Sequence, residues 1–234
     1  MREINIKAFN ESVGGLTGYD CDICKNKGHM LIKDENGYEL SRECECMKIR
    51  NNLIRIRKSG MENAFLRYSF DNFLTKEDWQ RKIKTTALKY TESEHDWFYI
   101  GGCIGSGKSH ICTAICHEFI MKNNIYFMPW RDEIVKIKAS VNNPYDYNEL
   151  TKRIKNAQIL YIDDFLKGRV TEADLNFAFE IINYRYAERR RTIISSEHTI
   201  ENLTLMDEAI GSRIYEMSKN FICELTGDKN MRFS

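Results

Sequence analysis

The feature that most constrains this chain is the octapeptide GCIGSGKS at residues 102–109. It fits the pattern G-x-x-x-x-G-K-[ST], and it lies between an apolar run that ends at Ile100 and an amphipathic stretch with apolar residues at helical spacing. Glycines let such a loop turn tightly and point its backbone N–H groups at phosphate oxygens, and the start of the following helix adds a favourable dipole. The motif therefore predicts a strand, a phosphate-binding loop and a helix, in that order.

This loop predicts a site for ATP or ADP with Mg²⁺. Lys108 is expected to reach the β and γ phosphates, and the Ser109 hydroxyl is expected to bind Mg²⁺. The alternative, a Gly-rich turn with a solvated lysine, is disfavoured by the strand–loop–helix context. The predicted nucleotide-binding residues of this segment are Gly102, Cys103, Ile104, Gly105, Ser106, Gly107, Lys108, Ser109 and His110.

A second apolar run delivers two carboxylates. The sequence ILYIDD, from Ile159 to Asp164, is typical of a buried strand that ends at the sheet edge where open α/β proteins bind ligands. We expect Asp163 to hold Mg²⁺ through water and Asp164 to act as the general base for the attacking water. Two aspartates after a strand could instead begin a loop or cap a helix. The phosphate loop favours the catalytic interpretation.

Five short apolar runs alternate with amphipathic stretches, a pattern that predicts an α/β fold with a mostly parallel five-stranded sheet covered on both faces. The runs are WFYI from Trp97, IYFM from Ile125, ILYI from Ile159, TIIS from Thr192 and FICEL from Phe221.

The first 46 residues contain half of the eight cysteines, arranged as C-x-x-C and then C-x-C. Four thiolates satisfy tetrahedral Zn²⁺ without an open position, so we expect Cys21, Cys24, Cys44 and Cys46 to form a structural zinc site. Four unrelated buried cysteines are the alternative, and His29 is a possible substitute ligand. The remaining cysteines lie on predicted core elements and are expected to be small buried residues.

After the cysteines comes a basic segment, MKIRNNLIRIRKSG, with no acidic residue and with Ile49, Leu53 and Ile56 at helical spacing. It predicts a basic helix that either contacts DNA phosphates, pairs with an acidic partner surface, or is simply solvated on its charged face. We therefore expect three parts: a zinc-binding module at 1–46, a linker helix at 47–66 and an ATPase domain at 67–234.

Charge and hydropathy exclude some classes of protein. The chain has 35 Lys and Arg against 34 Asp and Glu, so a nucleic-acid contact must come from a local patch. No apolar stretch reaches the length of about 18 residues that a membrane helix needs, and the N-terminus lacks a secretory layout. We expect a cytoplasmic protein without a membrane partner.

The chain resembles the bacterial and phage replicative-helicase loaders of the DnaC/DnaI type, which are AAA+ ATPases. The resemblance covers nearly the whole length and depends on an ordered set of motifs: GCIGSGKS, ILYIDDF with LKGRVTEAD, EIINYRY, RRTIISSE and AIGSRIYEM. It implies an AAA+ P-loop core behind a zinc-binding module that docks on the helicase.

The resemblance also assigns further residues. The strand ending at Ser195-Ser196-Glu197 looks like the sensor 1 strand. Glu197 stands where many members have Asn, and Ser196 is the alternative polar contact. Arg213 matches the arginine finger that reaches the ATP of a neighbouring subunit, and Arg232 matches a sensor 2 arginine more weakly. Either arginine could instead be an ordinary surface residue.

The expected function is ATP-dependent loading of a DnaB-type helicase onto single-stranded DNA, with self-association through AAA+ interfaces. An IstB-like transposition helper shares the core, although the cysteine module favours the loader. A nucleotide-switched adaptor with little hydrolysis is a third hypothesis, because Asp164 is one methylene shorter than the glutamate common at this position. A small-molecule kinase is disfavoured by the absence of an evident lid or second substrate site.

Overall fold

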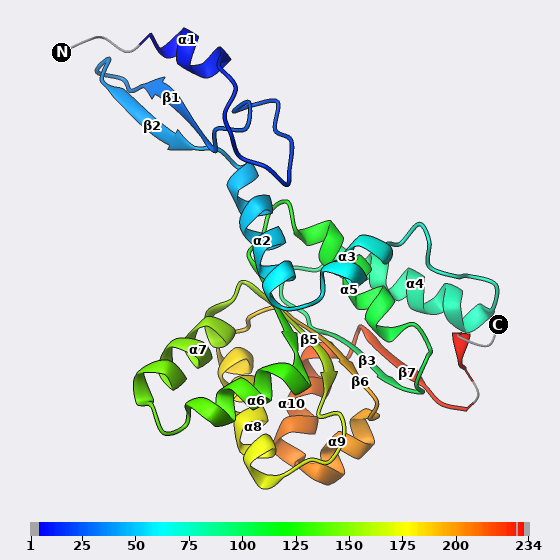
Figure 1. The fold of residues 1–234 in the computed structure, drawn as a ribbon. Coiled ribbons are helices and arrows are strands. Elements are labelled where there is room, and N and C mark those ends of the chain that lie inside the picture. Colours follow the sequence, from blue (N-terminus) through cyan, green and yellow to red (C-terminus); the bar gives the residue numbers. More distant parts are fainter. Residues whose placement is uncertain (1–4, 228, 232–234) are drawn as a thin grey trace.

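The five apolar runs form one parallel sheet in the computed structural model, which describes residues 5–227 and 229–231 (Figure 1). The strand order is β4-β5-β6-β3-β7, and every neighbouring pair is parallel. The prediction of a mostly parallel five-stranded sheet is therefore confirmed. The strands are β3 (Phe98–Gly102), β4 (Ile125–Pro129), β5 (Ile159–Phe165), β6 (Thr192–Ser196) and β7 (Ile222–Leu225).

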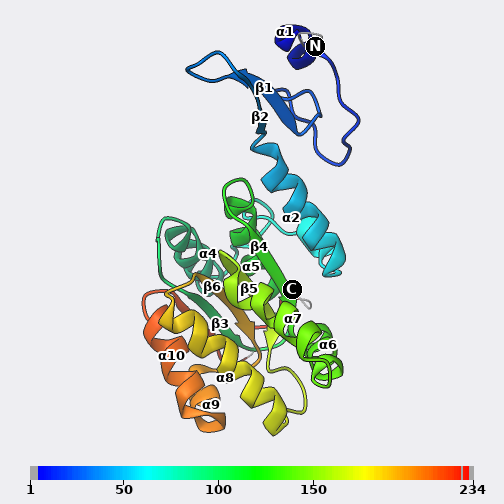
Figure 2. The same ribbon diagram turned by 90° about the vertical axis from the view of Figure 1, so that its left-hand side faces the viewer.

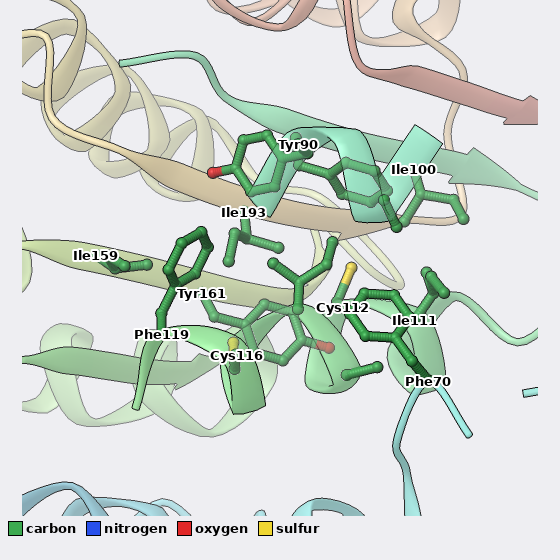
Figure 3. Packing of buried hydrophobic residues seen from close by; sticks show 14 of the residues in the cluster. Phe70, Tyr90, Ile100, Ile111, Cys112, Cys116, Phe119, Ile159, Tyr161 and Ile193 are labelled. Carbon is green, nitrogen blue, oxygen red and sulfur yellow. The ribbon is translucent and has the colours of Figure 1, made fainter. Parts of the chain in front are cut away.

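Helices cover both faces of this sheet. Successive strand residues point to opposite sides, so a continuous apolar run puts apolar side chains on each face. On one face, Ile159 and Tyr161 of β5 pack with α4 (Asp78–Thr91) and α5 (Lys108–Phe119), as Figure 3 shows for part of this cluster. On the other face, Leu160 of β5 packs with a second set of helices. These are α6 (Trp130–Ser140), α7 (Pro144–Asn156), α8 (Glu172–Ala187), α9 (Ile200–Met206) and α10 (Glu208–Ser218).

The residues before the core form a small separate unit. It contains α1 (Ile6–Glu11) and an antiparallel hairpin of β1 (His29–Lys33) and β2 (Glu39–Glu43). Both views show this unit held away from the sheet by the helix α2 (Cys46–Lys58), which leads into α3 (Glu62–Arg67) (Figures 1 and 2). The basic segment thus forms a helix between the two parts, but the predicted linker helix at 47–66 is in fact two helices, because α2 ends at Lys58 and α3 begins at Glu62.

The helix α2 is hydrogen-bonded both to the N-terminal unit and to the core. Near its start, the buried guanidinium of Arg50 donates to the carbonyl oxygens of Thr17 (2.8 Å) and Tyr19 (2.5 Å) in the N-terminal unit. Two residues later, the fully buried amide of Asn52 bonds to the connection between α5 and β4 and to the first residue of β4. Arg50, one of the basic side chains of this segment, is therefore hydrogen-bonded inside the molecule. Among the described residues, no helix is long and apolar enough to cross a membrane.

Candidate functional site

The loop after β3 has the backbone that its glycines predict. Gly107, at the N-cap of α5, has φ of +83°, and Gly102 has φ of +106°. A Cβ on Gly102 would also lie 2.1 Å from the carbonyl oxygen of Leu225 on the neighbouring strand β7. Other residues are disfavoured at these positions by their φ angles and, at Gly102, also by a direct clash. The loop turns directly into the N-terminus of α5, which is the local geometry that phosphate-binding loops share.

Lys108 is buried beside this loop. Its Nζ donates to the carbonyl oxygens of Gly102 (3.0 Å) and Cys103 (2.6 Å). Burial lowers the pKa of Lys108, and the nearby carboxylates of Asp164 and Glu197 oppose that shift. A buried ammonium that is bonded only to carbonyls fits a site for a polyanion, because a phosphate is a better partner for it than a neutral oxygen.

The Ser109 hydroxyl and the Asp163 carboxylate meet at the start of α5. Ser109 Oγ donates to Asp163 Oδ1 at 2.9 Å, and the same oxygen accepts from Tyr161 (2.7 Å) and Ser195 (2.7 Å). The strand β5 thus aims Asp163 toward the α5 face of the sheet. A hydroxyl and a carboxylate oxygen in contact are hard oxygen donors of the kind that Mg²⁺ prefers, so the two residues fit the predicted magnesium site.

Asp164 occupies an unusual backbone position. Its φ is +55°, that of Leu166 is +56°, and the register between β5 and β6 shifts between Ile162 and Phe165. Bulges of this kind re-aim side chains next to active sites. The Asp164 N–H donates to Ser195 Oγ at 2.9 Å, so one serine supports both aspartates.

A lysine that the sequence did not single out joins the two acidic residues at this edge. Lys167 Nζ lies 2.8 Å from Asp164 Oδ2 and 3.0 Å from Glu197 Oε1. Glu197, directly after β6, therefore faces a cation, and its charge also acts on Lys108. The signal for Lys167 was its position three residues after Asp164, but sequence alone does not show that the chain turns back there.

The two serines of β6 point to opposite sides. Both are fully buried, but Ser195 donates to Asp163, whereas Ser196 donates to the carbonyl oxygen of Phe165 at 2.9 Å. The sequence named Ser196 as the polar contact and did not identify Ser195 or Tyr161. The structure places Ser195, not Ser196, among the residues of the candidate site.

Other predicted loop residues have partners of their own. The side chain of Cys103 is only half-buried and donates to the carbonyl oxygen of Gly227 at 2.7 Å, in contrast with the expectation of a buried thiol, while Ser106 is buried and donates to the Cys103 carbonyl. Ile104 is exposed. His110 Nε2 lies 2.9 Å from the carbonyl oxygen of Ser69, and burial lowers its pKa.

Met231 lies against this loop. The Met231 N–H donates to the carbonyl oxygen of Gly105 at 2.9 Å, and the Met231 side chain packs against the core beside Gly107. The structure therefore places Met231 against the candidate nucleotide site. Arg232, the predicted sensor 2 residue, lies outside the described residues.

Arg213 is folded back onto its own subunit. Its Nη1 donates to the Ala209 carbonyl at 2.8 Å, and its guanidinium lies over the rings of Phe179 (5.4 Å) and Tyr186 (5.5 Å). The Nε of Arg213 is buried and has no hydrogen-bond partner within the described residues. Contact with a neighbouring subunit stays a prediction.

The four N-terminal cysteines form one cluster. All their Sγ atoms lie within 4.8 Å of one another, all four side chains are buried, and His29 is exposed outside the cluster. The Sγ–Sγ distances are 3.7 Å for Cys21–Cys44 and 3.6 Å for Cys24–Cys46. Four sulfur donors at this mutual spacing fit tetrahedral Zn²⁺. The cysteines therefore meet the geometric requirement of the predicted zinc site.

A polar groove of about 770 Å³ lies between α2 and the α6–α7 region, with Arg55, Lys58, Lys136 and Arg153 in its lining. The Lys136 ammonium pairs with the buried Glu133 carboxylate, and Arg153 lies 3.9 Å from Glu149. Arg55 and Lys58 have no carboxylate partner within the described part of the chain. Burial lowers the pKa of Arg55. The groove therefore offers cations to an anionic partner.

Comparison with known proteins gives consistent matches. The family model for IstB-like ATP binding protein matches residues 26–216. The phage-like element PBSX protein XkdC of Bacillus subtilis (strain 168) is 31% identical over 227 residues, which cover 89% of this chain and 83% of that protein. The replicative helicase loader DnaC of Buchnera aphidicola subsp. Schizaphis graminum is 27% identical over 183 residues, which cover 75% of this chain and 71% of the relative.

Solved structures match the core. A crystal structure of the DnaC helicase loader superposes with a TM-score of 0.61 and 22% identity, and the match covers 69% of this chain and 98% of that one. The chain spans only about half the length, 52%, of a DNA replication initiation factor that it also matches. These likenesses show the fold.

Proposed function

This chain belongs to the IstB-like ATP-binding protein family, and from that premise we propose that it is a Mg²⁺-dependent ATPase that loads a DnaB-type replicative helicase onto single-stranded DNA. The resemblance to DnaC/DnaI loaders and the expected AAA+ fold are confirmed. Hydrolysis, helicase loading and the role of each site residue belong to the proposal.

One observation carries the ATPase part of the proposal: Ser109 and Asp163 meet at 2.9 Å beside the buried Lys108. Lys108 would neutralise the β and γ phosphates, and Ser109 and Asp163 would hold Mg²⁺, which polarises the phosphates when bound. Asp164, the next residue on β5, is the proposed general base. Arg213 of a neighbouring subunit would neutralise charge that develops on the transferred phosphoryl group.

The loader part of the proposal is supported by the cysteine unit. It stands away from the core on α2, and the bonds of Arg50 and Asn52 tie α2 to both parts. A unit that is presented in this way can hold a partner while the AAA+ core changes its assembly. Ile23 and Tyr38 expose apolar side chains on it, with 66% and 69% of their surface accessible. Such residues suit a protein contact.

Single-stranded DNA is the second proposed partner, and the cationic groove beside α2 supports it. Phosphate contacts from Lys and Arg give affinity without sequence preference. DNA contact is equally expected of a transposition helper, so DNA binding alone does not separate the two functions. Helicase binding does.

The deciding experiment is size-exclusion chromatography and pull-down of the full chain with replicative helicases of bacterial hosts, with ATP, with ADP and without nucleotide. We expect a stable complex that the double variant Ile23→Ser/Tyr38→Ser loses. The matched control is Leu205→Ser, which removes a side chain that is 79% exposed on α9 of the core. No complex with any helicase, together with ATP-dependent DNA binding, would favour the transposition helper.

The nucleotide-switched adaptor is favoured by one observation, the ion pair that occupies Asp164 Oδ2. Substitution of Asp164 by Asn separates the two ideas. If the proposed enzyme mechanism holds, Asp164→Asn abolishes turnover and keeps ATP binding. Unchanged turnover would remove Asp164 as the general base, and negligible turnover in the unmodified chain would favour the adaptor.

A further inference from the structure

Lys167 is the one lysine among the described residues that bridges two carboxylates of the candidate nucleotide site. Its ammonium lies 2.8 Å from Asp164 Oδ2 and 3.0 Å from Glu197 Oε1, and about a third of its side chain is exposed. The two acidic residues come from the ends of β5 and β6, which are neighbours in the sheet. We name Asp164, Lys167 and Glu197 the acidic bridge.

Backbone geometry places Lys167 there. Asp164 and Leu166 both have positive φ, and the Lys167 N–H donates to the Asp164 carbonyl at 3.1 Å. Positive φ is rare for residues other than glycine and costs free energy, so its occurrence twice within three residues marks a conformation that the surroundings impose. The result is a tight turn that returns the Lys167 side chain to the sheet edge.

The acidic bridge lies within electrostatic reach of the phosphate lysine. Burial is the largest influence on Lys108 and lowers its pKa. The charges of Asp164 and Glu197 raise this pKa in part, and the charge of Lys167 lowers it. Burial also tends to lower the pKa of Lys167, but the hydrogen bonds and charges of Asp164 and Glu197 outweigh it, so its pKa is raised. Lys167 is therefore a full cation at neutral pH.

The positive charge of Lys167 offsets part of the negative charge at this site. Asp164 and Glu197 together carry two negative charges beside the place where a triphosphate must bind, and Asp163 adds a third that Mg²⁺ can offset. Like charges at short range in a partly buried site oppose binding strongly, because screening by water is incomplete there. Without a cation, Glu197 would make the site less suitable for ATP.

We propose that Lys167 is a nucleotide-positioning residue, which allows ATP to bind by offsetting one of the two negative charges of Asp164 and Glu197 and thereby lets the site favour ATP over ADP. The proposal rests on the proposed ATP binding. With Lys108 on the β and γ phosphates and Mg²⁺ at Ser109 and Asp163, the γ phosphate would approach the Asp163–Asp164 edge, so the charge of the acidic bridge would act more on ATP than on ADP. Glu197 fixes Lys167 from the second strand.

The test is equilibrium binding of the Mg²⁺ complexes of AMPPNP and ADP to the full chain. Substitution of Lys167 by Met changes the net charge of the acidic bridge from −1 to −2. We expect it to weaken AMPPNP binding about tenfold, the effect of roughly 1.4 kcal/mol of repulsion, and ADP binding less than about threefold. Lys167→Arg, which keeps the charge, should bind AMPPNP like the unmodified protein.

A compensating variant separates charge from packing. Lys167→Met combined with Glu197→Gln restores the net charge of the acidic bridge to −1, so AMPPNP affinity should return to within about threefold of the unmodified protein, since only the charge balance is at issue. Glu197→Gln alone should bind AMPPNP at least as well as the unmodified protein. The matched control is Lys155→Met, which breaks a similar ion pair with Glu180 (2.6 Å) on α7 and α8.

The outcomes are distinct. Selective loss of AMPPNP affinity in Lys167→Met, with recovery in the double variant and an unchanged melting temperature, supports the proposal. Unchanged AMPPNP affinity in Lys167→Met, or no recovery in the double variant, overturns the proposed role of Lys167. In that case the proposed function still stands, provided that the unmodified chain binds ATP. Failure of the unmodified chain to bind either nucleotide would overturn the proposed function and this inference together.

Discussion

The side-chain carbonyl of Asn52 on α2 accepts a hydrogen bond from the backbone N–H of Ile125 on β4 at 3.0 Å. The amide of the same residue donates to the carbonyl oxygens of Ile120 (2.9 Å) and Asn123 (2.7 Å). Asn52 is fully buried, so these three backbone groups take their hydrogen bonds from its side chain and not from water. The helix between the cysteine unit and the core is therefore fixed to the core and is not a free tether.

Substitution of Asn52 by Ala should destabilise the core. It leaves the Ile125 N–H and two carbonyl oxygens without their protein partner in a buried place, and we expect a loss of about 2–4 kcal/mol in the free energy of unfolding. Chemical denaturation monitored by circular dichroism measures it. Asn51→Ala is the matched control, because the Asn51 side chain makes no hydrogen bond within the described residues. Equal effects of the two substitutions would show that the Asn52 bonds contribute little.

Substitution of Ser195 by Ala should impair the proposed turnover. Ser195 Oγ supports Asp163 at 2.7 Å and accepts from the Asp164 N–H at 2.9 Å, so its loss frees both aspartates to move. Groups that orient metal ligands typically contribute about 10- to 100-fold, and we expect a fall of that size in kcat with a higher Mg²⁺ requirement. Steady-state ATPase assays at several Mg²⁺ concentrations measure both.

Ser196→Ala is the control for this substitution, since its hydroxyl donates to the Phe165 carbonyl inside the fold. Ser196→Ala should lower the free energy of unfolding and change kcat less than Ser195→Ala does. A larger fall in kcat for Ser196→Ala than for Ser195→Ala, at equal stability, would reverse the assignment of the two serines.

The serines also illustrate how far the sequence could be interpreted. The loop at 102–109 and the five strands follow from local patterns, namely glycine spacing and apolar runs, so both were predicted. Which serine of β6 faces the site depends on which sheet face α5 covers. Ser195 shares its face with Ile193, on the α5 side, and no local pattern identifies that side in advance.

Non-local geometry explains the other omissions. Lys167 reaches Asp164 and Glu197 only because two residues with positive φ turn the chain back, and a run of ordinary residue types gives no sign of this. The basic segment was recognised as a helix, but the use of Arg50 as a donor to backbone carbonyls of the N-terminal unit requires the tertiary fold. The cysteine pairs were found because their spacing itself expresses the geometry of a metal site.

Removal of zinc should unfold the N-terminal unit and spare the core. Before α2, the buried apolar side chains among the described residues are the thiols of Cys21, Cys24 and Cys44, so the unit has little else to fold around. A metal supplies the folding free energy of such small units. We expect Cys24→Ser to lower zinc content from about one per chain and to make residues before 46 sensitive to protease.

Elemental analysis and limited proteolysis measure these effects. The control is Cys223→Ser, which alters a buried thiol of the core and should leave zinc content unchanged. ATP affinity should stay the same in the Cys24 variant, because the site lies at the far side of α2. Absence of zinc from protein purified without chelator would contradict the prediction.

Neutralisation of the cationic groove should weaken binding of single-stranded DNA. Lys58 and Arg153 line the groove from α2 and α7, and their replacement by Gln keeps a polar side chain at each position while removing two charges. If each cation neutralises one phosphate, the slope of log K against log salt should become shallower by about 0.7 for each contact with a single strand. Fluorescence anisotropy with a labelled oligonucleotide at several salt concentrations measures this slope. Lys219→Gln, at the exposed C-cap of α10, is the control and should leave the slope unchanged. Equal slopes for the groove variant and this control would place any DNA contact elsewhere on the molecule, whereas a shallower slope confined to the groove variant would assign the phosphate contacts to α2 and α7.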